Sequence, residues 1–177
     1  MKKAIPIFFA MAMVAPSTYA GEARVTWQEP GQYTDIRPGN ESPEVFQARV
    51  FKELDKTFSD LAKELPDGYL MEIIVTNLDL AGEANRMSST AGRDIRVIKQ
   101  NDWPRMSFNY TLKDSKGELA ASGKEELKDM SFMAQSGFLP DNTSFGYEKK
   151  MLKDWFKRQQ KQKKFPINEK QAKKSSR

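Results

Sequence analysis

The chain of 177 residues contains no cysteine and no histidine. Without cysteine there is no disulfide framework, so the burial of apolar side chains must hold the fold by itself, and no cysteine-linked lipid anchor is expected. Without histidine, a Ser-His-Asp or Cys-His nucleophile and the usual His/Cys zinc sites are excluded. The remaining options are carboxylate chemistry, a Ser-Lys pair, hard cations bound by oxygen, and binding without catalysis.

Long apolar runs are also scarce, because the chain has only one, from Ala4 to Ala15 near its start. Two lysines precede this run, and the short segment after it ends with the small residues Thr18 and Ala20. A positive start, a short apolar run and a small-residue end are typical of a secretory signal peptide. The run is too short to cross a bilayer, which needs about 20 apolar residues.

We therefore predict that residues 1–20 are a signal peptide and that cleavage falls between Ala20 and Gly21, with cleavage after Ala23 as the alternative. The mature protein is then expected to be periplasmic or secreted and to have no transmembrane segment. A buried N-terminal core helix is the competing interpretation of the same apolar run.

Charge is divided unevenly along the chain. Residues 21–148 hold 15 basic and 22 acidic side chains, a net charge of −7, whereas residues 149–177 hold 12 basic and 2 acidic side chains, a net charge of +10. Such asymmetry is typical of an interaction arm, with a solvated, solubilising tail as the equal alternative. We expect a single domain over residues 21–158 and a basic tail over 159–177, disordered from residue 166.

Apolar periodicity and turn residues predict an α+β fold. Ser42, Pro43 and Glu44 form a strong helix start, and apolar residues then recur every three or four positions. The run at 69–80 reads as a central strand buried on both faces, with a bulge inside it as the alternative, and the strand at 118–127 reads as one near an edge. We expect a mainly antiparallel sheet of about four strands with both helices packed on one face. The strands are expected at 24–27, 69–80, 106–112 and 118–127, and the helices at 43–65 and from 147 onward.

Two regions are candidates for a partner surface. The long connection at 130–146 has many large apolar residues, which either cap the open end of the core or form a docking loop. The basic tail is a candidate for binding an anionic surface. The candidate residues are Phe132, Met133 and Phe138 in the connection and Lys161, Lys163 and Lys164 in the tail.

Acidic residues gather in sequence around the end of the central strand. Asp79 and Glu83 flank this end, and Asp35 and Asp94 lie in nearby loops. Two carboxylates at about 5–10 Å are suited to glycoside hydrolysis, and carboxylates also bind calcium. None of the spacings is diagnostic, so we assign no catalytic, cofactor-binding or metal-binding residue.

Several segments resemble, in one order, an exported bacterial family known as domain of unknown function 3016. They are VTW at 25–27, YTDIRP at 33–38, LDLAGE at 78–83, DIRVI at 94–98, WPRM at 103–106, LKDMSFM at 127–133 and YEKKMLKDWF at 147–156. The resemblance covers roughly residues 25–156 and implies a periplasmic or secreted location, but no activity and no catalytic residues. Asn77 departs from the aspartate expected there, which argues against a metal at this strand end.

The sequence favours a non-catalytic binding domain of the cell envelope. Its expected partner is another envelope protein or an anionic surface, and nucleic acid is not expected. One alternative is a carboxylate-dependent envelope hydrolase, and another is a protein that associates with the membrane surface through its basic tail.

Overall fold

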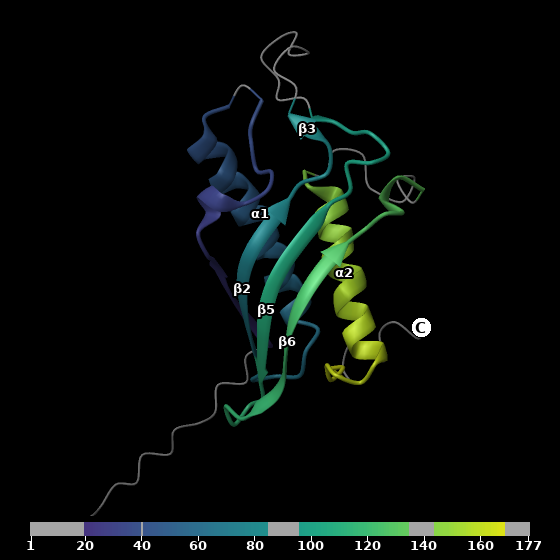
Figure 1. Cartoon of the computed structure of the whole chain (residues 1–177). Helices are drawn as coiled ribbons and strands as arrows, with labels where there is room; N and C mark the ends of the chain where they lie inside the picture. The colour runs from purple at the N-terminus through teal and green to yellow at the C-terminus, as the bar shows by residue number, and fades with distance from the viewer. Residues whose placement is uncertain (1–19, 40, 85–95, 135–143, 169–177) are drawn as a thin grey trace, which may run out of the picture.

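The computed structural model describes residues 20–39, 41–84, 96–134 and 144–168, which form an α+β domain (Figure 1). The sheet order β1-β2-β5-β6 joins one parallel pair, β1 with β2, to two antiparallel pairs, and β3 and β4 form a small separate ladder. The elements are β1 (Glu22–Trp27), the 3-10 turn η1 (Pro30–Gln32), α1 (Pro43–Ala62), β2 (Leu70–Asp79), β3 (Glu83–Ala84), β4 (Arg96–Val97), β5 (Arg105–Lys113), β6 (Leu119–Lys128) and α2 (Gly146–Lys161).

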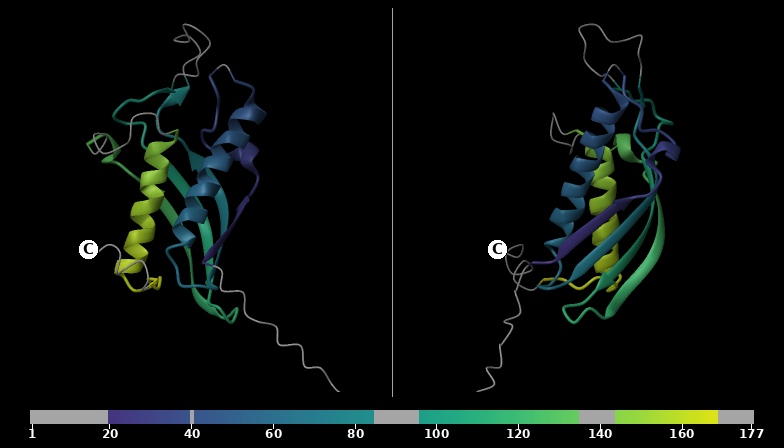
Figure 2. Two further views of the ribbon diagram at one scale, coloured as in Figure 1. Left: turned by 180° about the vertical axis from the view of Figure 1, so that it is seen from behind. Right: turned by 90° about the vertical axis from the view of Figure 1, so that its left-hand side faces the viewer.

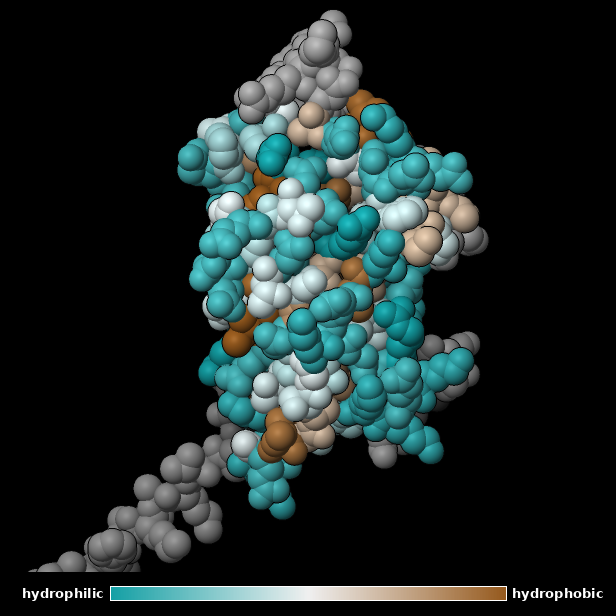
Figure 3. Space-filling view, in the orientation of Figure 1, coloured by the Kyte–Doolittle hydropathy of each residue, from teal (hydrophilic) through white to brown (hydrophobic). Residues whose placement is uncertain are grey.

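Both helices cover the same face of the four-stranded sheet, as the two views of Figure 2 show. The opposite face is open, and Figure 3 shows it as mostly hydrophilic, with small and separate hydrophobic spots. The core therefore lies between the sheet and the helices. The predicted α+β fold, mainly antiparallel with both helices on one face, is confirmed.

The first helix begins as the sequence predicts. The Ser42 hydroxyl accepts a hydrogen bond from the Val45 backbone N–H at 3.3 Å, and Pro43 occupies the first turn. The predicted apolar stripe is buried. The helix ends at Ala62, three residues before the expected end, but Leu65 still lies in the core.

The prediction that the strand at 69–80 is buried on both faces is wrong. Ile73 and Val75 are buried, whereas the side chain of Ile74 between them is 43% exposed, because no helix covers the outer face. The register with β5 shifts between Val75 and Asn77, so a bulge turns Leu78 back into the core. This bulge makes a one-sided strand look continuously apolar in sequence.

The edge position expected for the strand at 118–127 is confirmed, because β6 pairs only with β5 in the described sheet. Its weak apolar alternation has a packing reason. A side chain at Gly123 would place its Cβ 2.9 Å from the Tyr110 ring, so only glycine leaves room for this buried tyrosine.

The packed chain continues beyond residue 158, where the sequence placed the start of the tail. Gln159 is 4% exposed and Phe165 is 1% exposed, and the phenyl ring of Phe165 lies edge-on to the Trp155 ring at 5.5 Å. The Asn168 backbone N–H then donates to the Glu64 carbonyl at 3.2 Å. Helical periodicity missed this segment because Phe165 follows the end of α2. Residues 169–177 of the expected tail lie outside the described residues.

Phe165→Ala should destabilise the fold by about 3–5 kcal/mol, because it leaves a cavity between Trp155 and Tyr110. A chain ending at residue 158 should lose at least as much stability, while one ending at Asn168 should unfold like the full chain in urea. Ile167→Ala is the matched control, since Ile167 is 53% exposed and its change should stay within about 0.5 kcal/mol. Equal stability of the two truncated chains would contradict a domain boundary after Asn168.

Candidate ligand-binding groove

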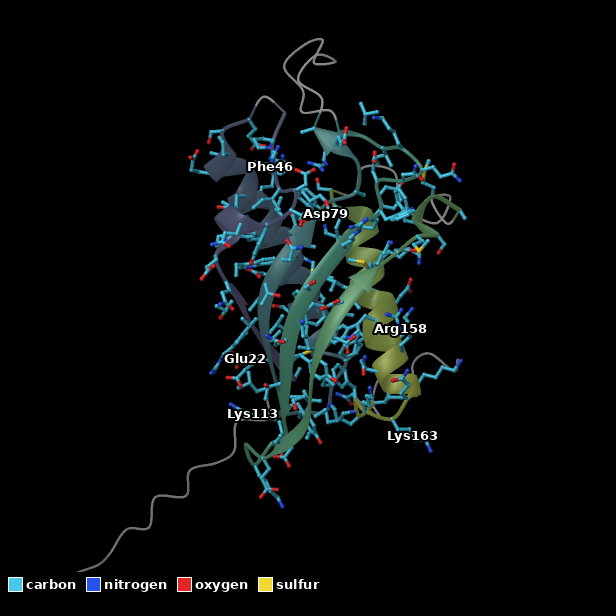
Figure 4. All side chains as sticks on the ribbon, viewed as in Figure 1. Glu22, Phe46, Asp79, Lys113, Arg158 and Lys163 are labelled. Atoms are coloured by element: carbon cyan, nitrogen blue, oxygen red, sulfur yellow. The ribbon has the colours of Figure 1, made fainter. Side chains whose placement is uncertain are left out.

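An open groove of about 740 Å³ lies beyond the ends of β1 and β2. Its walls come from three segments, at 34–38, 79–84 and 101–105. Because β1 and β2 are parallel, the loops that follow them emerge at the same edge of the sheet, the usual place for ligand sites in sheets with parallel strands. Figure 4 shows the labelled Asp79 at this end, far from Lys113 and Lys163 at the other.

Backbone pairing holds the first wall against the second. The Asp35 N–H donates to the Leu78 carbonyl at 3.2 Å, and the Leu80 N–H donates to the Asp35 carbonyl at 3.0 Å, so the chain after β1 continues to pair with β2. Asn77 adds a side-chain clamp. Its Oδ1 accepts from the Thr34 N–H at 2.9 Å, and its Nδ2 donates to the Thr34 hydroxyl at 2.9 Å. An aspartate at this position has no side-chain N–H group, so it could not donate the hydrogen bond to the Thr34 hydroxyl.

Arg96 on β4 joins the walls through one part-buried guanidinium. Its side chain is 15% exposed, and its Nη2 lies 2.5 Å from Asp35 Oδ2. The same guanidinium donates to the carbonyl oxygens of Ala81 at 3.1 Å and Arg37 at 3.0 Å, and also to those of Leu80 and Gly82. A planar fork of five donors suits such a set of acceptors. Sequence reasoning did not single out Arg96, although it lies in the DIRVI segment of the family resemblance.

The groove gathers three of the four carboxylates considered from the sequence: Asp35, Asp79 and Glu83. Burial raises the pKa of Asp79, although the Arg105 guanidinium, at 3.9 Å from its Oδ2, acts in the opposite direction. Asp102 joins the set, whereas Asp94 lies outside the described residues.

These carboxylates have partners of their own. Asp35 pairs with Arg96, and Glu83 lies 3.7 Å from the ammonium of Lys99. Asp102 accepts a hydrogen bond from the Lys99 backbone N–H at 3.0 Å. Within the residues that the structure describes, no three carboxylates converge as a metal site would require.

A buried glutamate supports the floor of the groove from behind. Glu148, in the first turn of α2, is 2% exposed, and its Oε1 accepts the Ala81 N–H at 2.7 Å. Burial raises the pKa of this carboxyl, while the Ala81 hydrogen bond lowers it. Gly82 follows at φ +76°, and a Cβ there would lie 2.7 Å from the Val97 carbonyl oxygen. The floor is thus fixed by Glu148, Arg96 and Gly82, and any other residue at position 82 would be strained.

The partner-surface candidates that the structure describes do not line the groove. Phe132 is 1% exposed and packs edge-on against the Tyr147 ring at 4.8 Å, so it belongs to the interior, as the capping alternative expects. Met133 is 41% exposed, and Phe138 lies outside the described residues. The three tail lysines, Lys161, Lys163 and Lys164, are exposed at the end of α2.

The fold and the groove define a small α+β domain with a polar recess at the ends of a parallel strand pair. A family model matches residues 21–158, and the chain belongs to this family, described as "Protein of unknown function (DUF3016)". No curated protein and no solved structure matches the chain. The family match ends ten residues before the last described residue, Asn168. In the part of the chain that the structure covers, no helix has both the length and the apolar character to span a membrane.

Replacing Glu148 by glutamine should remove part of the pH dependence of stability. The folded pKa of Glu148 is raised, so its contribution is fully present below the unfolded pKa and is lost as pH rises through the folded pKa. Glu148→Gln keeps an oxygen for the Ala81 N–H, so its stability relative to the wild type should increase from about pH 4 to about pH 8 in urea unfolding. Glu148→Ala, the control, should be about 1–3 kcal/mol less stable than Glu148→Gln at every pH, because it leaves the Ala81 N–H without its acceptor. Identical pH slopes for the wild type and Glu148→Gln would contradict this role.

Proposed function

We propose that the protein is an exported, non-catalytic binding domain of the cell envelope, whose groove holds a basic segment of another envelope protein. The observation that carries this proposal is that four carboxylates and two arginines, from three segments, line one groove with a fixed floor. The carboxylates are Asp35, Asp79, Glu83 and Asp102, and the arginines are Arg37 and Arg105. An acidic recess of this kind attracts cations and concentrates them at its opening.

The rim of the groove can exchange its own cation for one from a ligand. Glu83 and Lys99 are 71% and 65% exposed at their side chains, and 3.7 Å separates their charged groups. Such an exposed pair contributes only about 0–1 kcal/mol, so a ligand lysine or arginine replaces Lys99 at little cost. Arg105 stays close to Asp79 deeper in the groove and offers donors to the carbonyl groups of a peptide.

The start of the fold supports export with cleavage after Ala20. β1 begins at Glu22, and the Glu22 N–H donates to the Tyr69 carbonyl at 2.9 Å. Cleavage after Ala20 leaves β1 complete, whereas cleavage after Ala23 removes the residues that pair with Leu70 and Met71. Gly21 is buried, and a Cβ there would lie 2.2 Å from the Ala62 carbonyl oxygen.

The exported protein should therefore begin at Gly21, as intact-mass measurement of the protein recovered from a bacterial periplasm will show. A chain that begins at Arg24 should be less stable by about 2 kcal/mol, since about two backbone hydrogen bonds are lost at roughly 1 kcal/mol each. Recovery of an uncleaved chain from the cytoplasm, or of a stable product that begins at Arg24, would argue against the proposal.

A carboxylate-dependent hydrolase is the second candidate. The observation that favours it is Asp79, whose pKa is raised by burial and by its neighbours Asp35 and Asp102. A carboxyl group with a raised pKa is suited to act as a general acid at neutral pH. Against this role, the nearby Asp35 is held by Arg96, and a two-carboxylate mechanism needs a second carboxylate that is free to act as a base or nucleophile.

Photocrosslinking from the groove separates these functions. A photoreactive residue at Asn101, on the groove wall, should capture an envelope protein in the native host, while one at Ser122, on the outer face of β6, should not. The double variant Glu83→Gln and Asp102→Asn should reduce the Asn101 adduct about three- to tenfold, since each weak charge pair contributes up to about 1 kcal/mol. Glu118→Gln with Glu126→Gln is the matched control, because both of these glutamates are exposed outside the groove.

The same experiment includes an Asp79→Asn arm. A binding domain forms the adduct in both the wild type and Asp79→Asn, whereas a hydrolase that uses Asp79 accumulates it only in the variant. Equal adducts from Asn101 and Ser122 would overturn binding in the groove.

A further inference from the structure

Six exposed cations gather on the second helix and on the turn that follows it. We call them the basic surface: Lys153, Lys157, Arg158, Lys161, Lys163 and Lys164. The spacing of four places Lys153, Lys157 and Lys161 on one stripe, opposite the buried stripe that contains Leu152 and Trp155. In Figure 4 the labelled Arg158 lies on α2, and Lys163 lies in the turn after it, at the end of the molecule that is distant from Asp79.

Within the described residues, these cations differ from most other helix lysines in forming no ion pair with a carboxylate. Lys56 and Lys63 pair with Asp60, Lys149 pairs with Glu53, and Lys150 pairs with Asp154. Among the described residues, by contrast, no ion pair involves a member of the basic surface. Acidic residues are common in the rest of the domain, since residues 21–148 carry a net charge of −7.

A recess of about 670 Å³ adjoins the basic surface between α2 and the end of β6. Its two carboxylates are engaged, because Asp129 accepts the Ser131 N–H at 3.0 Å and Asp154 pairs with Lys150. Its three cations are Lys128, Lys157 and Arg158. Lys128 is held over the Trp103 ring at 4.0 Å, so Lys157 and Arg158 are the cations that face an incoming anion. The recess is therefore suited to a single anionic group.

The helix dipole explains only part of this arrangement. Cations stabilise the carboxyl end of a helix, which accounts for Arg158 and Lys161 in the last turn of α2. Lys153 lies in the middle of the helix, and Lys163 and Lys164 lie beyond its end, where the dipole contributes little. Local helix stability therefore accounts for only two of the six cations.

We propose that the basic surface binds a bilayer of anionic phospholipids and that the recess beside Arg158 accepts a headgroup phosphate. Charge complementarity supports this, since clusters of lysine and arginine are attracted to anionic headgroups. Two apolar side chains flank the cations, Met130 at 63% exposure and Ile167 at 53%. Apolar side chains are favourable at the boundary between headgroups and acyl chains, whereas a soluble polyanion offers no apolar region to contact them. This inference does not depend on the groove.

Vesicle cosedimentation tests the proposal with the chain that begins at Gly21, which contains all described elements. Phosphatidylcholine vesicles with 30% phosphatidylglycerol should bind the protein at low salt, and binding should weaken steeply as salt is added. The triple variant Lys153→Gln, Lys157→Gln and Lys161→Gln should bind on the order of one hundredfold more weakly, because each cation contributes roughly a factor of five. The matched control removes Lys52, Lys56 and Lys63, three exposed cations of α1, in the same way.

Each outcome decides the question. Loss of binding in the α2 variant but not in the α1 variant, with an unchanged unfolding transition in both, supports the proposal. Equal loss in both variants, equal binding to pure phosphatidylcholine, or binding to soluble polyglutamate but not to vesicles would overturn it. Arg158→Gln, which leaves the stripe intact, should weaken binding clearly more than the roughly fivefold loss of any single surface cation if the recess holds a headgroup, and by only about fivefold if it does not.

Discussion

The rest of the structure depends on the aromatic packing around Trp155. Its indole ring lies edge-on to Phe108 at 4.9 Å and is inclined to Tyr110 at 5.6 Å, which joins α2 to β5, and Phe165 closes the cluster from the far side at 5.5 Å. Phe58 extends the cluster to α1 through Phe108. Inclined aromatic pairs of this kind contribute roughly 0.5–1.5 kcal/mol beyond the burial of their area. In a chain without cysteine, this packing takes the place of covalent bonds in fixing both helices on the sheet.

Because α2 is fixed by this cluster, its two ends have distinct roles. Its first turn places Glu148 behind the groove floor, where the carboxyl group holds the Ala81 N–H. Its last turns carry the basic surface, which faces away from the core. The buried stripe of the helix therefore positions both candidate sites, although none of its apolar residues lines the groove. A change in the packing of Trp155 is expected to disturb both sites together.

Local signals in the sequence predicted the elements that local physics controls. The start of α1 was predictable because the Ser42 cap and Pro43 act within one helical turn. The alternation in β5 was predictable because β5 has no bulge of its own in its pairing with β2. The bulge near Thr76 reversed the burial pattern of β2, and the return of Phe165 to the core follows no helical period. The groove was foreseen only as acidic residues near a strand end. Arg96 holds the groove together through backbone carbonyl groups that are distant in sequence. Every residue has such a carbonyl group, so the amino-acid types do not reveal these contacts.

The uneven distribution of charge gains a geometrical meaning from the fold. The groove holds more carboxylates than arginines, and it lies beyond the strand ends, whereas the basic surface follows α2 toward the opposite end. An anionic bilayer attracts the second and repels the first, so electrostatics favours one orientation of the whole domain. The two proposed partners, a basic segment and an anionic bilayer, would therefore contact different parts of the domain.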